Sequence, residues 1–348
     1  MSLLSLPTEL LCLLPSYLDN IESFTSAAST CRTLRAAFNS THPAVILRLA
    51  ASSAPTFFSP HPYFLVASSA RTVSDWALGH DDRTNSLRKA FKSGIYSLYD
   101  FILEHGGLTL DRIRQMHVAR FDIINPLSDK IDKMAGKQWM KTPRFWEGGV
   151  SEAITLYTDA DRATFQIIIY GELFGRSMDA FLDPGQNLPK LDMGARLDYL
   201  TYCLADEHEP NIPGVLQTDA QWAYHEDQRA LQHIVRCGRW RRMWAAAIRD
   251  FLDMEFGDQK PENENLRKKL LRDALMVQGV EGMELVTRKS GVAVSERYLQ
   301  RARTIKDQIG NLEKPPGVHL FGSKKHLKVA EAPDLTGELG VCNAKVWR

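Results

Sequence analysis

The first forty residues carry a pattern of apolar positions that predicts three short helices. Asp19 followed by Glu22 is typical of a helix start, because an aspartate there accepts unpaired backbone N–H groups. A unit this small buries too little surface to be stable alone, so we expect it to keep apolar surface for another protein to cover. The positions that define the helices are Pro7, Leu10, Leu11, Leu14 and Leu18 in the first, and Cys31, Leu34 and Phe38 in the third.

Beyond this unit the pattern divides the chain into three further parts. Residues 51–64 are rich in proline and serine and are predicted to form a linker. Helical periodicity dominates residues 65–310, whereas residues 311–348 contain prolines, glycines and lysines and are predicted to form a poorly packed tail. We therefore predict a mainly α protein, in which residues 1–50 form a small three-helix module packed on or linked to a larger, irregular all-helical domain. One face typical of that domain carries Ile95, Leu98, Tyr99, Ile102 and Leu103.

Composition is that of an ordinary globular protein. Of the 348 residues, 44% are apolar and 24% charged, and the formal net charge of +1 gives no global attraction to nucleic acid or acidic membranes. The five cysteines are scattered and form no CxxC pair, which favours buried thiols in a reducing compartment. The leucine-rich start has no basic residue before Arg32, unlike a secretory signal, and no segment is apolar enough to span a membrane. We predict a cytoplasmic or nuclear protein without a cofactor.

Two short motifs suggest chemistry that their spacing does not support. Residues 171–177 (GELFGRS) are similar to a phosphate-binding loop, but they are one residue short and have an arginine where lysine is needed. A helix contact or a turn is the expectation there. His225-Glu226 matches the start of a zinc-protease helix, but the second histidine four residues on is missing, so no metal site is predicted.

The order and spacing of three segments in the N-terminal unit resemble an F-box. These are Leu6-Pro7-Thr8-Glu9-Leu10-Leu11, Tyr17-Leu18 and Thr30-Cys31-Arg32-Thr33-Leu34-Arg35. The resemblance implies that the module docks onto a Skp-type adaptor of a cullin ubiquitin ligase. The alternative is a module that packs on its own body and recruits nothing. The resemblance implies these partner-binding residues: Leu6, Pro7, Leu10, Leu11, Leu14 and Leu18.

A second candidate surface is basic and aromatic. Residues 237–244 (CGRWRRMW) place arginines beside tryptophans, which suits stacking on bases and contact with phosphate. The alternative is an amphipathic helix, in which tryptophans four residues apart face the core and the arginines point outward. The candidate nucleic-acid-binding residues are Arg239, Arg241, Arg242, Lys268 and Lys269.

A third candidate is the acidic cluster Asp206, Glu207 and Glu209, which follows a predicted helix and precedes Pro210. Neighbouring carboxylates repel one another, so they tend to have raised pKa values and suit general-base chemistry or guanidinium binding. The cluster is similar to the Asp-Asp-x-x-Glu motif of the fungal arginine-containing cyclodipeptide synthases, except that Ala205 stands where the first aspartate belongs. That resemblance implies catalytic roles for these carboxylates and aminoacyl-tRNA as the partner, with a diketopiperazine as product.

The sequence thus supports three hypotheses. The first is an F-box-type adaptor, which predicts exposed apolar residues on the N-terminal helices and binding to a Skp-type protein. The second is a tRNA-dependent cyclodipeptide synthase, which predicts the acidic cluster in a pocket near a basic surface. The third is an interaction scaffold with neither activity. The first is favoured because its motif is longer, although the chain lacks the fixed-period repeats that many substrate receptors carry.

Overall fold

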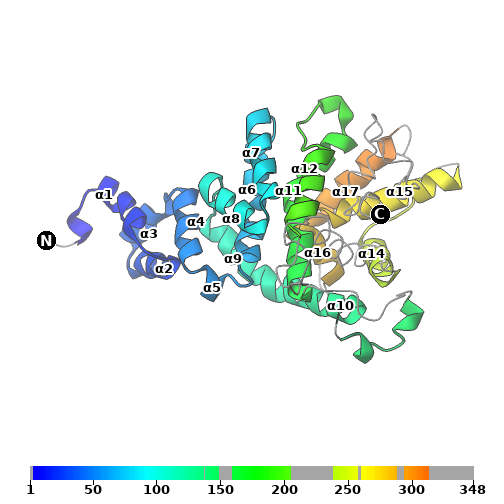
Figure 1. The fold of residues 1–348 in the computed structure, drawn as a ribbon, viewed down its shortest axis with the longest axis horizontal. Helices are drawn as coiled ribbons and strands as arrows, with labels where there is room; N and C mark the ends of the chain where they lie inside the picture. The colour runs from blue at the N-terminus through cyan, green and yellow to red at the C-terminus, as the bar shows by residue number, and fades with distance from the viewer. Residues whose placement is uncertain are drawn as a thin grey trace, which may run out of the picture.

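The computed structural model describes residues 3–136, 138–148, 159–204, 238–257, 260–287 and 294–312. About 79% of these residues are helical and none of them forms a strand, which confirms the predicted mainly α fold class. Figure 1 shows the N-terminal helices at one end of an elongated molecule, with α6 and α11 near the centre and α14, α15 and α17 toward the other end. Among the described helices, none is long and apolar enough to cross a membrane.

The N-terminal module contains the three predicted helices, with one short 3-10 turn before the first and another between the first and the second. The second helix begins one residue later than predicted, since Asn20 rather than Asp19 accepts the capping hydrogen bond, from the Ser23 N–H at 2.8 Å. The Cys31 thiol sits at the start of the third helix, where it accepts from the Leu34 N–H at 3.5 Å. The elements are η1 (Leu3–Ser5), α1 (Thr8–Leu13), η2 (Leu14–Tyr17), α2 (Ile21–Thr30) and α3 (Arg32–Asn39).

Helix α4 (Pro43–Ser52) connects this module to the body. It packs against α2 and η2 on one side and against α8 on the other. The Arg48 guanidinium donates to the Ser16 carbonyl at 2.9 Å, and the Ser53 hydroxyl donates to the Glu22 carboxylate at 2.7 Å. The module is therefore held against α4 by polar contacts as well as by packing.

The segment 51–64, predicted as a linker, is instead packed into the protein. It contains the short helix α5 (Ala54–Phe57), and Phe58 is buried with its ring 5.5 Å from that of Phe64. The prolines and serines of this segment favour turns, but the segment also contains aromatic residues. Burial of the aromatic rings stabilises a packed arrangement more than the prolines and serines favour an open one.

Two central helices organise the body. α6 (Tyr63–Ala77) and α11 (Ala160–Leu182) pack against each other, and almost every residue of α11 between Ala163 and Met178 is buried. Residues 171–177 lie inside α11. They form part of a helix and not a phosphate-binding loop, in agreement with the expectation of a helix contact. The remaining described elements surround this pair: α7 (Asp81–Lys92), α8 (Ile95–His105), α9 (Leu110–Ala119), η3 (Arg120–Ile124), α10 (Asn125–Ala135), η4 (Trp139–Lys141), η5 (Trp146–Gly148), η6 (Pro184–Gln186), α12 (Met193–Tyr202), α14 (Gly238–Phe251), α15 (Pro261–Met276), α16 (Val280–Thr287) and α17 (Glu296–Asn311).

Candidate functional site

The outer side of the N-terminal module carries an exposed leucine surface. In α1 the neighbours Leu10 and Leu11 have opposite environments, since Leu10 is 47% exposed whereas Leu11 is 1% exposed. Leu11 lies in the module's core with Phe24 and Phe38, whose rings are 5.0 Å apart. The N-terminal surface is defined by the exposed residues Leu3, Leu4, Leu6, Leu10, Leu13 and Tyr17.

The spacing of these residues explains how one short segment is apolar on two sides. Leu10, Leu13 and Tyr17 follow one another at steps of three and four along α1 and η2, which brings residues to one face of a helical segment, and Leu3 and Leu6 precede that segment. Leu11 and Pro15 occupy the opposite side and are buried. The segment thus uses one side for its own core and leaves a second apolar side in solvent.

The structure divides the six predicted partner-binding residues into three groups. Leu6, Pro7 and Leu10 are exposed; Leu14 and Leu18 are half-buried; and Leu11 is buried and unavailable to a partner. The F-box resemblance did not mark Leu3, Leu4 and Leu13, although the three-residue steps from Leu3 to Leu6 and from Leu10 to Leu13 are visible in the sequence.

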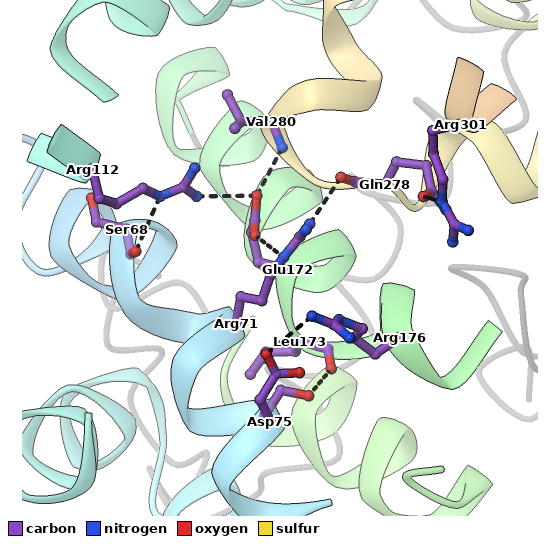
Figure 2. Close-up of polar contacts among 11 residues, drawn as sticks. Ser68, Arg71, Asp75, Arg112, Glu172, Leu173, Arg176, Gln278, Val280 and Arg301 are labelled. Atoms are coloured by element: carbon purple, nitrogen blue, oxygen red, sulfur yellow. Dashed lines mark hydrogen bonds and ion pairs between the residues drawn. The ribbon is translucent and has the colours of Figure 1, made fainter. Parts of the chain in front are cut away.

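Within the body, a buried carboxylate connects three distant segments. Glu172 on α11 is 1% exposed and forms ion pairs with Arg71 of α6, at 2.8 Å, and with Arg112 of α9, at 3.3 Å (Figure 2). Its Oε1 also accepts a hydrogen bond from the Val280 N–H at 3.1 Å, at the start of α16. Burial opposes the charge of Arg71, but Glu172 and Glu281 raise its pKa above the usual value. We call Glu172, Arg71 and Arg112 the ionic centre.

Close backbone packing accompanies the ionic centre. Gly279 has φ of +72°, and a Cβ there would collide with the Glu172 carboxylate. A Cβ on Gly171 would in turn collide with the backbone of Gly279. Glu172 satisfies an N-terminal N–H of α16 that otherwise has no partner in the helix, and the two guanidinium groups balance the buried charge. The arrangement is that of a structural fastening between α6, α9, α11 and α16.

A cavity of about 950 Å³ lies beside Arg112, between α9, η3, α16 and α17. Its rim includes Val118 and Phe121, which are 60% and 70% exposed. Tyr298 lines it from α17 and is 2% exposed, with a hydroxyl that meets no hydrogen-bond partner among the described residues. Burial, together with the negative charge of Glu281, raises the pKa of Tyr298, so its hydroxyl stays protonated at neutral pH. No sequence motif marked this cavity, because its walls come from segments far apart in the chain.

The basic and aromatic stretch forms an amphipathic helix, which was the alternative to a nucleic-acid-binding surface. Trp240 and Trp244 on α14 are fully buried, whereas Arg241 and Arg242 are exposed. Arg239 donates to the Phe145 carbonyl at 3.1 Å and lies over the Phe145 ring.

On α15 the candidate basic residues also make contacts within the chain. Lys268 forms ion pairs with Glu255 at 2.8 Å and Glu264 at 3.1 Å, and Lys269 is half-buried. Arg239 and Lys268, both candidate nucleic-acid contacts, therefore have partners within this chain.

The acidic cluster Asp206, Glu207 and Glu209 lies outside the described residues, as does His225. Among the residues that the structure does describe, no group of three His, Cys, Asp or Glu side chains could hold a metal ion.

Comparison of the chain with models of known families, with curated proteins and with solved structures yields no match.

Proposed function

We propose that this protein is an F-box-type adaptor that recruits a partner protein to a Skp/cullin ubiquitin ligase. In this proposal the N-terminal surface binds the Skp-type adaptor, and the helical body binds the partner to be delivered. The observation that carries the proposal is the concentration of exposed apolar residues at the start of the chain. Of thirteen large apolar side chains exposed in the described residues, six lie within residues 3–17.

Burial of this surface would supply substantial binding free energy. Complete burial of one leucine side chain contributes about 1.5–3 kcal/mol, and several of these leucines are roughly half exposed. Leu11, Phe24 and Phe38 form the core of the module, so Leu11 is used internally, whereas Leu6, Leu10 and Leu13 stay exposed and available to a partner. Its place at one end of the molecule leaves the body accessible to a second partner (Figure 1).

The direct test is co-purification of the full chain with a recombinant Skp-type adaptor. Wild-type protein is expected to form a stoichiometric complex, and the double variant Leu10→Ala plus Leu13→Ala is expected to lose it. The variant Pro7→Ala plus Leu10→Ala is expected to weaken it as well. A matched control is Leu188→Ala, because Leu188 is 37% exposed but lies in the body, after η6. Failure of the wild-type chain to bind, or equal binding by Leu10→Ala plus Leu13→Ala, would contradict the proposal.

The cyclodipeptide synthase alternative depends on Asp206 and Glu209, and no observation on the described residues favours it. The same preparation separates the two hypotheses. Purified protein is incubated with charged tRNAs, and cyclic dipeptides are sought by mass spectrometry. A product that disappears in Asp206→Asn would replace the adaptor proposal with an enzymatic one.

A further inference from the structure

The segment that contains η4 and η5 is held in place by a group of aromatic rings. The ring centroids of Trp139, Phe145 and Trp146 lie 5.2 Å, 5.2 Å and 5.6 Å from one another. Arg239 of α14 lies over the Phe145 ring, 4.9 Å from its centroid. The same guanidinium donates to the Phe145 carbonyl at 3.1 Å and to the carbonyl of the residue before it at 2.7 Å. These contacts fix the segment beside the start of α14.

The outer part of this segment is apolar and exposed. Met140 is 75% exposed and Trp146 is 58% exposed, whereas Phe145 alone is buried between residues 138 and 147. Figure 1 shows the segment after α10, at the edge of the molecule and away from the N-terminal helices. Exposed apolar residues that lie together mark surfaces that bind other molecules. The ring group therefore presents Met140 and Trp146 to solvent on a fixed support.

The charged residues around these two side chains are mostly positive. Residues 138–148 and 238–245 contain five cations and a single carboxylate, that of Glu147; the cations are Lys141, Arg144, Arg239, Arg241 and Arg242. Glu147 lies 4.0 Å from Arg144, and both are so exposed that the contact offsets little of the charge. The Lys141 side chain is exposed and has no hydrogen bond or ion pair to another described residue. The last two turns of α10 carry two lysines and two aspartates, so the positive excess remains.

The arrangement of the rings favours a protein partner over a nucleic acid. Arg239 covers one face of the Phe145 ring, and Trp146 meets Trp139 and Phe145 at interplanar angles of 63° and 86°. The rings therefore form no common platform on which successive bases could stack. Met140 has no ring, and its flexible thioether chain suits packing on apolar side chains. Exposed tryptophan, methionine and arginine are the residue types enriched where proteins bind proteins.

We propose that the surface formed by Met140, Lys141, Arg144 and Trp146 binds an acidic peptide segment of a partner protein. An apolar side chain of the peptide packs on Met140 and Trp146, and flanking carboxylates pair with Lys141 and Arg144. We call these four residues the aromatic–basic surface. That the peptide belongs to the protein delivered to the ligase rests on the proposed adaptor function, whereas recognition of an acidic, apolar segment does not.

Fluorescence anisotropy of labelled peptides with the full-length protein tests this assignment. The first peptide has a central leucine with two aspartates or glutamates on each side. The second replaces the acids with asparagine and glutamine, the third replaces them with lysine, and the fourth replaces the leucine with serine. The first peptide is expected to bind about tenfold or more tightly than each of the others, and more weakly as salt is raised. Equal binding by the second or fourth peptide, or tighter binding by the third, would overturn the proposal.

Variants then locate the binding at the aromatic–basic surface. Met140→Ser and Trp146→Ser are each expected to weaken the first peptide about fivefold or more, and Lys141→Gln plus Arg144→Gln about tenfold. Lys141→Glu plus Arg144→Glu is expected to shift the preference toward the lysine peptide. Trp146 also contacts the ring group, so thermal unfolding is measured for its variant, and Met140→Ser decides the result if that variant unfolds. Unchanged affinity in Met140→Ser, or in Lys141→Gln plus Arg144→Gln, would overturn the proposal.

Matched controls come from another exposed surface. Val118→Ser and Arg114→Gln change side chains of α9 that are 60% and 75% exposed, so they are expected to leave peptide affinity unchanged. Single-stranded RNA and phosphatidylserine vesicles are tested on the same variants. Tighter binding of either than of the acidic peptide, lost in Lys141→Gln plus Arg144→Gln, would replace the protein partner with a nucleic acid or a membrane and overturn the proposal.

Binding of the Skp-type adaptor to the same variants separates this proposal from the adaptor proposal. The variants of the aromatic–basic surface are expected to retain adaptor binding, because the N-terminal surface lies on different elements. Loss of acidic-peptide recognition with adaptor binding intact would leave the adaptor proposal standing. A chain that binds the acidic peptide but no Skp-type adaptor would keep the aromatic–basic surface and refute only the adaptor function.

Discussion

The N-terminal module and the ionic centre depart from the usual distribution of residues in opposite ways. In the module, leucines lie outside, and Leu10 and Leu13 are about half exposed. In the body, a carboxylate lies inside, with Glu172 1% exposed. The body satisfies its unusual residue from within, because Arg71, Arg112 and the Val280 N–H all contact Glu172 (Figure 2). The module has no such internal compensation for its leucines.

This difference indicates where the molecule depends on another protein. A buried charge that is paired and hydrogen-bonded gives a specific arrangement of helices and requires nothing further. An exposed apolar surface is costly in water until something covers it. Substitutions in the ionic centre should therefore change stability, whereas substitutions on the N-terminal surface should change binding. The following predictions test that distinction, beginning with the largest expected effect.

Glu172→Gln is expected to reduce the free energy of unfolding by about 3 kcal/mol, near the lower limit for breaking a buried pair. The lower limit applies because Arg71 and Arg112 retain some contact with water, with side chains 36% and 23% exposed. Denaturant unfolding measures the change, and Glu262→Gln, at an exposed position, should stay within about 0.5 kcal/mol of wild type. An equally small effect of Glu172→Gln would show that the ionic centre does not fasten the body.

Leu11→Ala and Leu10→Ala form a matched pair on α1. Leu11→Ala removes a buried side chain from the core, so it should destabilise the chain by about 2–5 kcal/mol. Leu10→Ala should change stability by about 0.5 kcal/mol or less, yet weaken binding to the Skp-type adaptor. Denaturant unfolding and co-purification measure the two effects. Comparable destabilisation by both variants would mean that Leu10 is covered by this same chain.

Gly279→Ala should destabilise the protein by about 2 kcal/mol or more, because it combines backbone strain with displacement of Glu172. Gly257→Ala separates the two causes. Gly257 has a similar φ, +71° against +72°, but nothing lies within 4 Å of its added Cβ, so strain alone should cost about 1–2 kcal/mol. Thermal unfolding of both variants gives the comparison, and equal effects would argue against close packing on Glu172.

The smallest expected effect concerns pH. Burial, with a smaller contribution from the charge of Arg120, lowers the pKa of His117 below 6.5 in the folded protein. The unfolded chain therefore takes up a proton first, so the contribution of His117 to stability is present above about pH 6.5 and is lost as pH falls below it. Unfolding at pH 7.5 and 5.5 should differ less in His117→Gln than in wild type. His80→Gln, at an exposed position, should leave that difference unchanged.

Local sequence pattern predicted the N-terminal helices, the helical character of the body and several buried faces. Leu34 and Phe38 are buried as the third helix required, and Trp240 and Trp244 face the core as their spacing of four indicated. The same pattern could not separate Leu10 from Leu11, although one is exposed and the other buried. The segment 51–64 was wrongly predicted as a linker. Its prolines and serines indicate turns of the backbone, but they do not indicate which distant residues bury Phe58.

The ionic centre and the cavity could not be predicted from the sequence. Glu172 lies in residues 171–177, which are similar to a phosphate-binding loop but lack its spacing. Nothing near it in the chain indicates Arg71 or Arg112 as partners. An acidic residue within a helix is expected at the surface, so its burial depends entirely on the segments that meet around it. Tyr298 likewise follows ordinary helical spacing, and only the packing of α17 into the body buries its hydroxyl without a partner among the described residues.

The sequence by itself determined that this chain is helical, where its N-terminal helices lie, and that its start is unusually rich in leucine. Tertiary structure decided which leucines remain outside, which charges go inside, and where a cavity opens. The physical reason is that helical periodicity depends on neighbours three and four residues away, whereas burial depends on segments brought together from across the chain.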